Sequence, residues 1–218
     1  VCTLASLNGF TLSKCELDIT NKYVDSYPLV KIPHHYLEQA LRFFNKNEEV
    51  DIYCNDSVIS LQSGDVEVSI ILHDVQVPDS ETLIKTWEAL IHNRVELKLT
   101  DLNYAINLIK PSEETNEGKI VLMWSDDGEN KLHLYSDVSG SVAHEKLPVK
   151  KQFVDECEIA LQLSALTKVI NSFGKTELEL GFSIKKNVIF VKEIGNNKRL
   201  AFVMGFQTVI TKPNKEEE

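Results

Sequence analysis

The sequence predicts an α+β fold built from a repeated unit in which one helix packs on an antiparallel sheet. Two observations support this prediction. A capping residue followed by an amphipathic helix occurs three times, and each copy precedes short β-branched segments separated by turn formers. The expected helix starts, Pro33, Thr100 and Ser164, are 67 and 64 residues apart. Because self-similarity at a fixed period indicates a repeat, we expect units of about 65 residues.

The clearest copy of the pattern spans residues 97–109, LKLTDLNYAINLI. Thr100 is a residue type that caps helix N-termini, and the apolar residues after it recur every three or four positions, so they share one helix face. We expect each helix to bury this face on a sheet, with Leu41, Ile106 and Ile170 at equivalent buried positions. The three faces consist of Leu37, Ala40 and Leu41; Leu102, Ala105, Ile106 and Ile109; and Leu166, Val169 and Ile170.

The predicted strands are grouped around these helices. Residues 1–19 are expected to form a hairpin about Asn8-Gly9, a dipeptide that favours tight turns. Because no helix precedes this hairpin, we expect it to be the end of a unit whose beginning lies outside the sequence. Residues 73–95 are predicted to be a connector with one short helix. The other strands are expected within residues 50–72, 120–163 and 178–206.

The net charge of −10 argues against a general affinity for nucleic acid, because phosphate contacts need a cationic surface. The charge is unevenly distributed, however. The expected helices, residues 34–47, 100–110 and 163–175, hold five basic and two acidic residues, whereas the rest of the chain holds 18 basic and 31 acidic residues. Polar stripes on two of these helices are either solvated faces or a surface for DNA phosphates. The stripes consist of His35, Gln39, Arg42 and Lys46, and of Lys168, Asn171 and Lys175.

The composition describes a globular protein without a membrane segment. Apolar residues make up 43% of the 218 positions and charged residues 26%. No run approaches the ~18 apolar residues of a membrane span, and no signal peptide is recognisable. The four cysteines form no CxxC pair, so thiols in a reducing cytosol are favoured over disulfides.

No motif for catalysis, metal binding or cofactor binding stands out. His34 and His35 are adjacent, and neighbouring helix residues point about 100° apart, so one metal ion does not suit both. Residues 126–130, DDGEN, begin like a calcium loop but lack the glutamate at the twelfth position, which favours a hairpin turn. His73-Asp74 has no serine or cysteine in a nucleophile motif to act on. We therefore expect no catalytic residue, metal or cofactor.

The repeated unit and three local segments resemble the bacterial DNA polymerase III β subunit family, the sliding clamps. Residues 4–17, LASLNGFTLSKCEL, are similar to the family's ATDGHRLA segment. Residues 59–79, ISLQSGDVEVSIILHDVQVPD, look like its stretch that runs from F-x-x-G-D to D-G-x-F-P-D. Residues 199–206, RLAFVMGF, lie where the family's chains end in an apolar V-M-P-M strand. The resemblance covers about residues 1–207.

This resemblance implies a DNA-clamp fold, with sheets outside and helices around a hole for duplex DNA. It implies an N-terminally incomplete middle domain at residues 1–96, a third domain at residues 97–212 and a disordered tail at residues 213–218. The polar stripes, together with Lys110, would contact phosphates without reading bases, so that the protein slides. The full-length protein would be a homodimeric ring, whereas this chain, without a first domain, would be monomeric.

The family binds DNA polymerase and clamp loader through a short peptide motif, in a cleft between the middle and third domains. Two departures keep the corresponding site apolar but remove a charge: Phe10-Thr11 replaces the family's His-Arg, and Gly205-Phe206 replaces its Pro-Met. Burial in a domain core is the alternative role, above all for Leu12 and Phe202. By position, the cleft residues are Leu7, Gly9, Phe10, Thr11, Leu12, Pro78, Thr82, Leu83, Phe202, Met204, Gly205 and Phe206.

The leading hypothesis is a cytoplasmic processivity factor that encircles duplex DNA and tethers the replicative polymerase and other partners. The alternative is a clamp-fold interaction scaffold, from a mobile element or a divergent lineage, that does not encircle DNA. A positive outer face on each helix would favour the first hypothesis. An enzyme with an unrecognised site is a third hypothesis, although the resemblance implies no catalytic activity.

Overall fold

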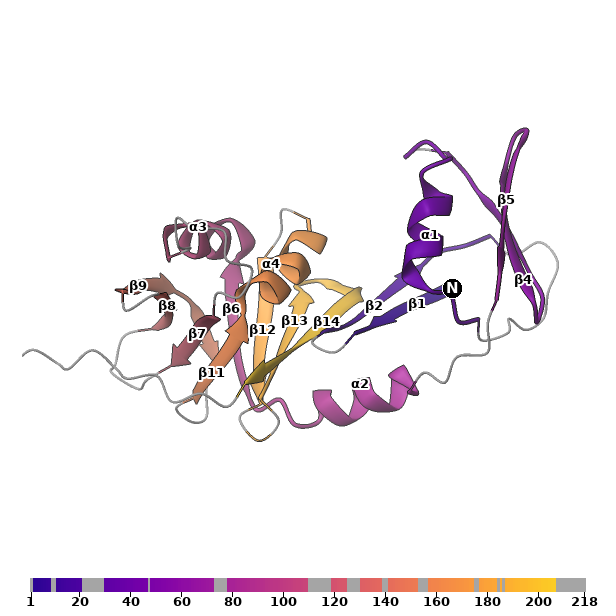
Figure 1. The fold of residues 1–218 in the computed structure, drawn as a ribbon. Helices are drawn as coiled ribbons and strands as arrows, with labels where there is room; N and C mark the ends of the chain where they lie inside the picture. The colour runs from indigo at the N-terminus through magenta and orange to yellow at the C-terminus, as the bar shows by residue number, and fades with distance from the viewer. Residues whose placement is uncertain are drawn as a thin grey trace, which may run out of the picture. The chain divides into compact units, whose positions relative to one another are not determined.

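The structure is a computed structural model whose elements divide into two compact units (Figure 1). The large unit comprises residues 1–18 and 80–218, and the small unit comprises residues 19–79. The residues that the structure describes are 2–8, 11–20, 30–46, 48–72, 78–109, 119–124, 130–138, 141–152, 157–174, 177–183, 185 and 187–206.

In its described residues, the large unit contains three helices and an extended antiparallel sheet. Its helices are α2 (Ser80–Glu88), α3 (Leu99–Ile109) and α4 (Leu163–Ser172). Its strands are β1 (Cys2–Leu7), β2 (Thr11–Leu17), β6 (Asn93–Lys98), β7 (Lys119–Trp124), β8 (Lys131–Val138), β9 (Ser141–Pro148), β10 (Lys150–Gln152), β11 (Cys157–Gln162), β12 (Glu177–Ser183), β13 (Val188–Glu193) and β14 (Asn196–Phe206).

The sheet runs in the order β10-β6-β12-β13-β14-β11-β7-β8-β9, and β2 adds to β14 and carries β1. Two helix-on-sheet repeats share this sheet, one around α3 and one around α4. Each repeat lends a strand to the other, because β6, which precedes α3, pairs with β12, and β11, which precedes α4, pairs with β7. The repeats are therefore interlocked and form one folding unit.

The main core lies between this sheet and the two helices that cover one of its faces (Figure 1). Leu102 and Ile106 of α3 and Leu166 and Ile170 of α4 are at most 3% exposed and belong to one apolar cluster. Full burial of such a side chain contributes about 1.5–3 kcal/mol each. The predicted apolar faces of these two helices are confirmed.

The small unit has one helix, α1 (His34–Leu41), and one sheet in the order β3 (Asp51–Cys54), β4 (Val58–Ser63), β5 (Val66–Ile71). Its core consists of Ala40, Ile59, Leu61 and Ile70. The predicted turns between its strands are confirmed. The Asn55 side chain accepts hydrogen bonds from the Ser57 and Val58 amides, both at 2.8 Å, and Gly64 has a φ of +56°, which glycine adopts without steric cost.

Several details of the helix predictions are wrong. The helix predicted over residues 34–47 ends at Leu41, and the helix predicted over residues 163–175 ends at Ser172. Thr100 and Ser164 are not caps but the second residues of their helices. The Thr100 hydroxyl instead lies 3.2 Å from the Asp101 carboxylate, to which it donates.

The described parts of the three helices carry no excess of positive charge. Within α1, α3 and α4 the sequence has one basic residue, Lys168, and two acidic residues, Glu38 and Asp101. Arg42 and Lys46 follow the end of α1, and Lys110 and Lys175 lie outside the described residues. A positively charged helix set therefore stays a prediction.

The equivalence of the three helices holds only in part. Ile106 and Ile170 are 3% and 0% exposed, whereas Leu41 is 50% exposed. The physical difference is that α3 and α4 pack on a sheet shared by two repeats, whereas α1 covers a sheet of three strands.

The compact units do not follow the expected clamp domains. Because β2 pairs with β14, contacts place residues 1–18 with the large unit rather than with residues 19–79. The division at residues 96 and 97 describes domains of the resembled family and stays a prediction.

The short helix predicted in the connector is confirmed as α2. Residues 126–129 of the predicted turn and the tail at residues 213–218 lie outside the described residues. In the part of the chain that is described, no helix has the length and apolar character needed to cross a membrane.

Candidate partner-binding site

Three aromatic and aliphatic side chains form a row across neighbouring strands of the large unit. Phe202 of β14 lies opposite Leu12 of β2 on one side and opposite Phe190 of β13 on the other. All three are 0% exposed, and the rings of Phe190 and Phe202 have centroids 5.2 Å apart. The alternation of a strand places this row on the sheet face opposite to α4, since Ala201 and Val203 point into the main core.

Helix α2 covers this row on the other side of the sheet from α4 (Figure 1). Ile84 is 6% exposed, and Trp87 meets Phe202 edge to face, with centroids 5.3 Å apart and planes at 74°. Leu83 and Trp87 are half-buried and lie four positions apart, on one helix face. We call this group the α2 cluster. It consists of Leu12, Ile84, Ile91, Val188, Phe190 and Phe202, with Leu7, Leu83, Trp87 and Leu200 partly buried against them.

The α2 cluster has an open end along β14. Met204 follows Phe202 on the same strand face and lies opposite Val188, which is 1% exposed and belongs to the cluster. Met204 itself is 36% exposed, and Phe206 beyond it is half-buried. An exposed, unbranched thioether beside buried aromatic rings is a surface that adapts to apolar side chains of different shapes.

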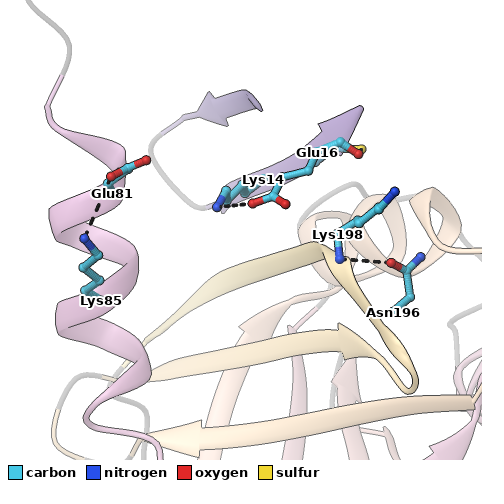
Figure 2. Close-up of polar contacts among 7 residues, drawn as sticks. Lys14, Glu16, Glu81, Lys85, Asn196 and Lys198 are labelled. Carbon is cyan, nitrogen blue, oxygen red and sulfur yellow. Dashed lines mark hydrogen bonds and ion pairs between the residues drawn. The ribbon is translucent and has the colours of Figure 1, made fainter. Parts of the chain in front are cut away.

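Charged and polar side chains lie on the elements around this apolar region. Figure 2 shows them on α2, β2 and β14. Glu81 and Lys85 pair along α2 at 3.9 Å, both largely exposed, so the pair contributes only about 0.3–0.5 kcal/mol. Lys14 and Glu16 pair along β2 at 2.7 Å. The hydrogen bond from Lys14, followed by its positive charge, holds the pKa of the Glu16 carboxyl below its usual range. These charges keep α2 and β2 hydrated beside an apolar surface.

The structure brings together half of the sequence-predicted cleft residues that it describes. Leu7, Leu12, Leu83 and Phe202 belong to the α2 cluster, and Met204 lies at its open end. Leu12 and Phe202 are core residues, as the alternative interpretation held. Gly9 and Phe10 lie outside the described residues.

Four predicted cleft residues have other positions or roles. Thr82 is exposed on α2, and its carbonyl accepts a hydrogen bond from the Thr86 hydroxyl at 2.7 Å. Pro78 is exposed and belongs to the small unit. Thr11 points to the opposite face of β2 from Leu12 and lines a hollow beside α4. Gly205 serves packing, because a Cβ there would lie 2.7 Å from the Ala160 carbonyl oxygen, where β14 meets β11.

Sequence reasoning missed the residues that complete the site. Trp87 and Ile84 come from α2, and Phe190 comes from β13. The i, i+4 spacing of Leu83 and Trp87 was a usable signal for an apolar helix face. Nothing in the sequence indicated that Phe190 pairs with Phe202, because that contact depends on strand order.

A polar hollow of about 410 Å³ lies on the α4 side of the large unit. It separates the first hairpin from α4 and is rich in hydroxyl and amide groups, with a single cation, Lys168. These groups suit hydrated or anionic ligands better than apolar ones. Its lining residues are Asn8, Thr11, Ser13, Gln162, Ser164, Ala165, Lys168, Val169 and Ser172.

The predicted DNA-facing residues are exposed where the structure describes them. His35 and Gln39 lie on α1, and Lys168 and Asn171 lie on α4. Arg42 and Lys46 follow the end of α1, and Arg42 pairs with Glu38 at 2.8 Å, so its charge is locally balanced. Lys110 and Lys175 lie outside the described residues.

A separate titratable cluster lies on β8 and β9. His133 Nδ1 and His144 Nε2 are 3.1 Å apart, and the Tyr135 and His144 rings stack with centroids 4.3 Å apart. Burial, followed by the charges of His133 and Lys146, lowers the pKa of His144. Among the described residues no group of three or more His, Cys, Asp or Glu side chains is placed to hold a metal ion.

These features define a class: interlocked helix-on-sheet repeats that carry a partly exposed apolar cluster on the sheet face opposite to α4. The particular fold is that of the bacterial sliding clamps. A Pseudomonas aeruginosa DNA polymerase sliding clamp superimposes with a TM-score of 0.80 at 21% identity, covering 94% of this chain and 55% of that one. A Bartonella birtlesii DNA polymerase III subunit β gives 0.79 at 18% identity, covering 94% and 58%. The C. crescentus β sliding clamp gives 0.79 at 15% identity, covering 94% and 53%.

The chain thus spans about half the length of the clamps whose fold it shares. A further Pseudomonas aeruginosa clamp was solved bound to griselimycin. No protein-family model matches the sequence, and no curated protein matches it.

Proposed function

We propose that the chain functions within a DNA sliding clamp, as a cytoplasmic binding protein rather than an enzyme, and that it tethers a DNA polymerase and other partners to duplex DNA. The single observation that carries the proposal is the α2 cluster with Met204 exposed at its open end, in a chain with the clamp fold. A short peptide motif needs such a surface, because a few anchored side chains supply most of its binding energy.

The proposed partner is a short segment with apolar anchor residues. Met204 and Phe206 would contact it directly, and Trp87 would border it. The exposed part of Met204 marks where the α2 cluster is reached from solvent, whereas Leu12 and Phe202 support the surface from below. The clamp loader would use the same surface, since Met suits a site that accepts several different peptides.

The test is peptide binding by the whole chain. Met204→Ala combined with Phe206→Ala should weaken binding of a polymerase-tail peptide at least tenfold, about 1.4 kcal/mol, with little change in melting temperature. Ile194→Ala is the matched control, because Ile194 is 38% exposed, similar to Met204, but lies in the turn that joins β13 and β14. If the double variant binds like the wild type, or if the control loses as much affinity, Met204 and Phe206 are not the partner site.

The DNA-related part of the proposal depends on the exposed residues of α1 and α4 and on those just after α1. Non-specific duplex binding through phosphates and closure into a homodimeric ring are further parts of the proposal, and the 218-residue chain by itself should be monomeric. Sedimentation of the chain as a tight dimer would contradict the last point.

A second candidate function has one observation in its favour. Within α1, α3 and α4, as far as the structure describes them, Lys168 is the single lysine, and Arg42 is paired with Glu38. A clamp-fold scaffold, from a mobile element or a divergent lineage, that binds partners without encircling DNA needs no positive helix face. Peptide binding with no salt-sensitive duplex binding by the full-length protein would favour this scaffold.

A further inference from the structure

Two histidines of the large unit meet across neighbouring strands, on the sheet face opposite to α3. Leu132 and Leu134 of β8 point into the main core, so the alternation of a strand places His133 and Tyr135 on the other face. His144 of β9 lies opposite Tyr135 in the register and therefore shares that face. The two histidines are 11 positions apart in the sequence and come together only because β8 pairs with β9.

The two imidazole rings face each other through ring nitrogens. His133 Nδ1 and His144 Nε2 are 3.1 Å apart, and the ring planes differ by 19°. At this distance one nitrogen donates a hydrogen bond and the other accepts it with its lone pair. If the shared proton moves to the other nitrogen of the donating ring, both lone pairs are directed at the same place. The pair therefore offers two ligand atoms for one ion.

The separation of the two nitrogens is close to that of two ligands on one metal ion. Zn–N bonds of about 2.0–2.1 Å at the tetrahedral angle place two ligand atoms about 3.3 Å apart. A small shift of the rings would bring His133 Nδ1 and His144 Nε2 to this separation. The Tyr135 hydroxyl lies 3.5 Å from His133 Nδ1, near enough to hydrogen-bond a water molecule on the ion.

The pair is both reachable and held in place. His144 is exposed and His133 is 5% exposed, so an ion would enter from the His144 side. The Tyr135 ring stacks on the His144 ring, with centroids 4.3 Å apart and planes at 2°, which limits rotation of the His144 ring. Burial, followed by the charges of His133 and Lys146, lowers the pKa of His144. Its ring is therefore neutral at pH 7, the form that binds metal.

Ligand type and charge define the class of ion. Among the described residues no third His, Cys, Asp or Glu joins the pair, and Lys146 lies opposite His133 on the same sheet face. Ca²⁺ and Mg²⁺ need several oxygen ligands, so the pair does not suit them. Zn²⁺, Cu²⁺ and Ni²⁺ bind imidazole nitrogen well.

We propose that His133 Nδ1 and His144 Nε2 bind Zn²⁺ or a similar divalent ion that prefers nitrogen ligands, with water in its other coordination positions. The ion takes the place of the hydrogen bond between the rings, and both imidazoles stay neutral because the shared proton moves to the other nitrogen of its ring. The bound ion joins β8 to β9. This inference is independent of the proposed partner and DNA binding.

The test is a Zn²⁺ titration of the whole chain, followed by NMR of the ring resonances of its six histidines. The His133 and His144 ring signals should shift together, and the melting temperature should rise, because an ion that binds the folded chain stabilises it. His144→Gln should weaken Zn²⁺ binding at least tenfold, since one of two protein ligands is lost. His144 is exposed, so this variant should fold, and unchanged amide signals of β8 and β11 verify that it does.

His92→Gln is the matched control, because His92 is an exposed histidine of the same unit and this variant should bind Zn²⁺ like the wild type. Cys54→Ser tests the exposed thiol, which is a competing type of zinc ligand. The proposal is overturned if the His133 and His144 ring signals do not respond to Zn²⁺, or if His144→Gln binds as tightly as the wild type. It is also overturned if His92→Gln or Cys54→Ser loses as much affinity as His144→Gln.

Discussion

Trp87 and Phe202 meet edge to face, with ring centroids 5.3 Å apart, although 115 positions separate them in the sequence. This contact joins α2 to β14, the central strand of the row formed by Leu12, Phe202 and Phe190. It marks the boundary between the α2 cluster and solvent. Aromatic pairs of this geometry contribute about 0.5–1.5 kcal/mol beyond the area that they bury.

The first prediction concerns this pair. Phe202→Leu and Trp87→Leu should each destabilise the large unit, and the double variant should lose less than the sum of the two, by about 0.5–1.5 kcal/mol. A double-mutant cycle from urea unfolding measures this coupling. Additive losses would show that the two rings do not interact as the geometry indicates.

The second prediction compares buried and exposed leucines. Leu166→Ala removes a side chain that is 0% exposed in the main core and should cost about 2–5 kcal/mol of unfolding free energy. Leu108→Ala is the control on the neighbouring helix, since Leu108 is 51% exposed and should change stability by less than about 0.5 kcal/mol. Equal losses would mean that α4 does not pack as described.

The third prediction concerns Gly205. A Cβ at this position would lie 2.7 Å from the Ala160 carbonyl oxygen and 2.8 Å from Ile159 Cγ2. Backbone is one of the two obstacles, so Gly205→Ala should push β14 away from β11 and cost about 1–3 kcal/mol. Thermal unfolding checks this, and a variant as stable as the wild type would show that the strand junction has room for a methyl group.

The fourth prediction is a pH dependence. Burial lowers the pKa of His144 in the folded chain. Near pH 6.5, the ordinary pKa of histidine, the unfolded chain therefore binds a proton at this residue more readily than the folded chain does. The stability from the neutral His144 is therefore present above that value and is lost as the pH falls through the lower, folded pKa. Melting temperatures at pH 8 and pH 5 should differ less in His144→Gln than in the wild type. His92→Gln, at an exposed position, should behave like the wild type.

The fifth prediction concerns DNA. In the full-length protein, Lys168→Glu should weaken duplex binding and reduce the slope of log affinity against log salt by about 0.9, as expected for one phosphate contact. Reversal of Arg42, Lys46 and Lys168 together should abolish stimulation of polymerase processivity while the fold is retained. Unchanged stimulation by this triple variant would remove these residues from the DNA surface.

Sequence periodicity was sufficient to predict the repeat, the apolar helix faces and most of the strands, because the spacing of apolar residues reflects burial directly. It failed at helix ends. Arg42 and Lys46 continue the polar stripe in the sequence, but α1 stops at Leu41, so spacing alone assigned them to a helix that they do not join. The burial predicted for Leu41 is wrong for another reason, since α1 covers a sheet of three strands, whereas α3 and α4 pack on a sheet shared by two repeats.

The candidate site was predictable only in its parts. Leu12, Leu83, Phe202 and Met204 were found through a resemblance in three separate segments, and the structure places the first three in one cluster with Met204 at its end. Trp87 and Phe190 were missed because their contacts with Phe202 arise from helix placement and strand order. Thr11 was misplaced because neighbouring strand residues point to opposite faces.

The most direct test of a partner site at the α2 cluster is an NMR titration of the whole chain with a polymerase-tail peptide. The chain has two methionines, so the methyl region of the spectrum is simple and the resonance of Met204 can be followed. We predict that the Met204 methyl and the Trp87 indole N–H shift as the peptide binds, while the Ala165 methyl in the polar hollow does not. Binding that leaves Met204 and Trp87 unshifted, or that shifts Ala165 instead, would contradict the assignment.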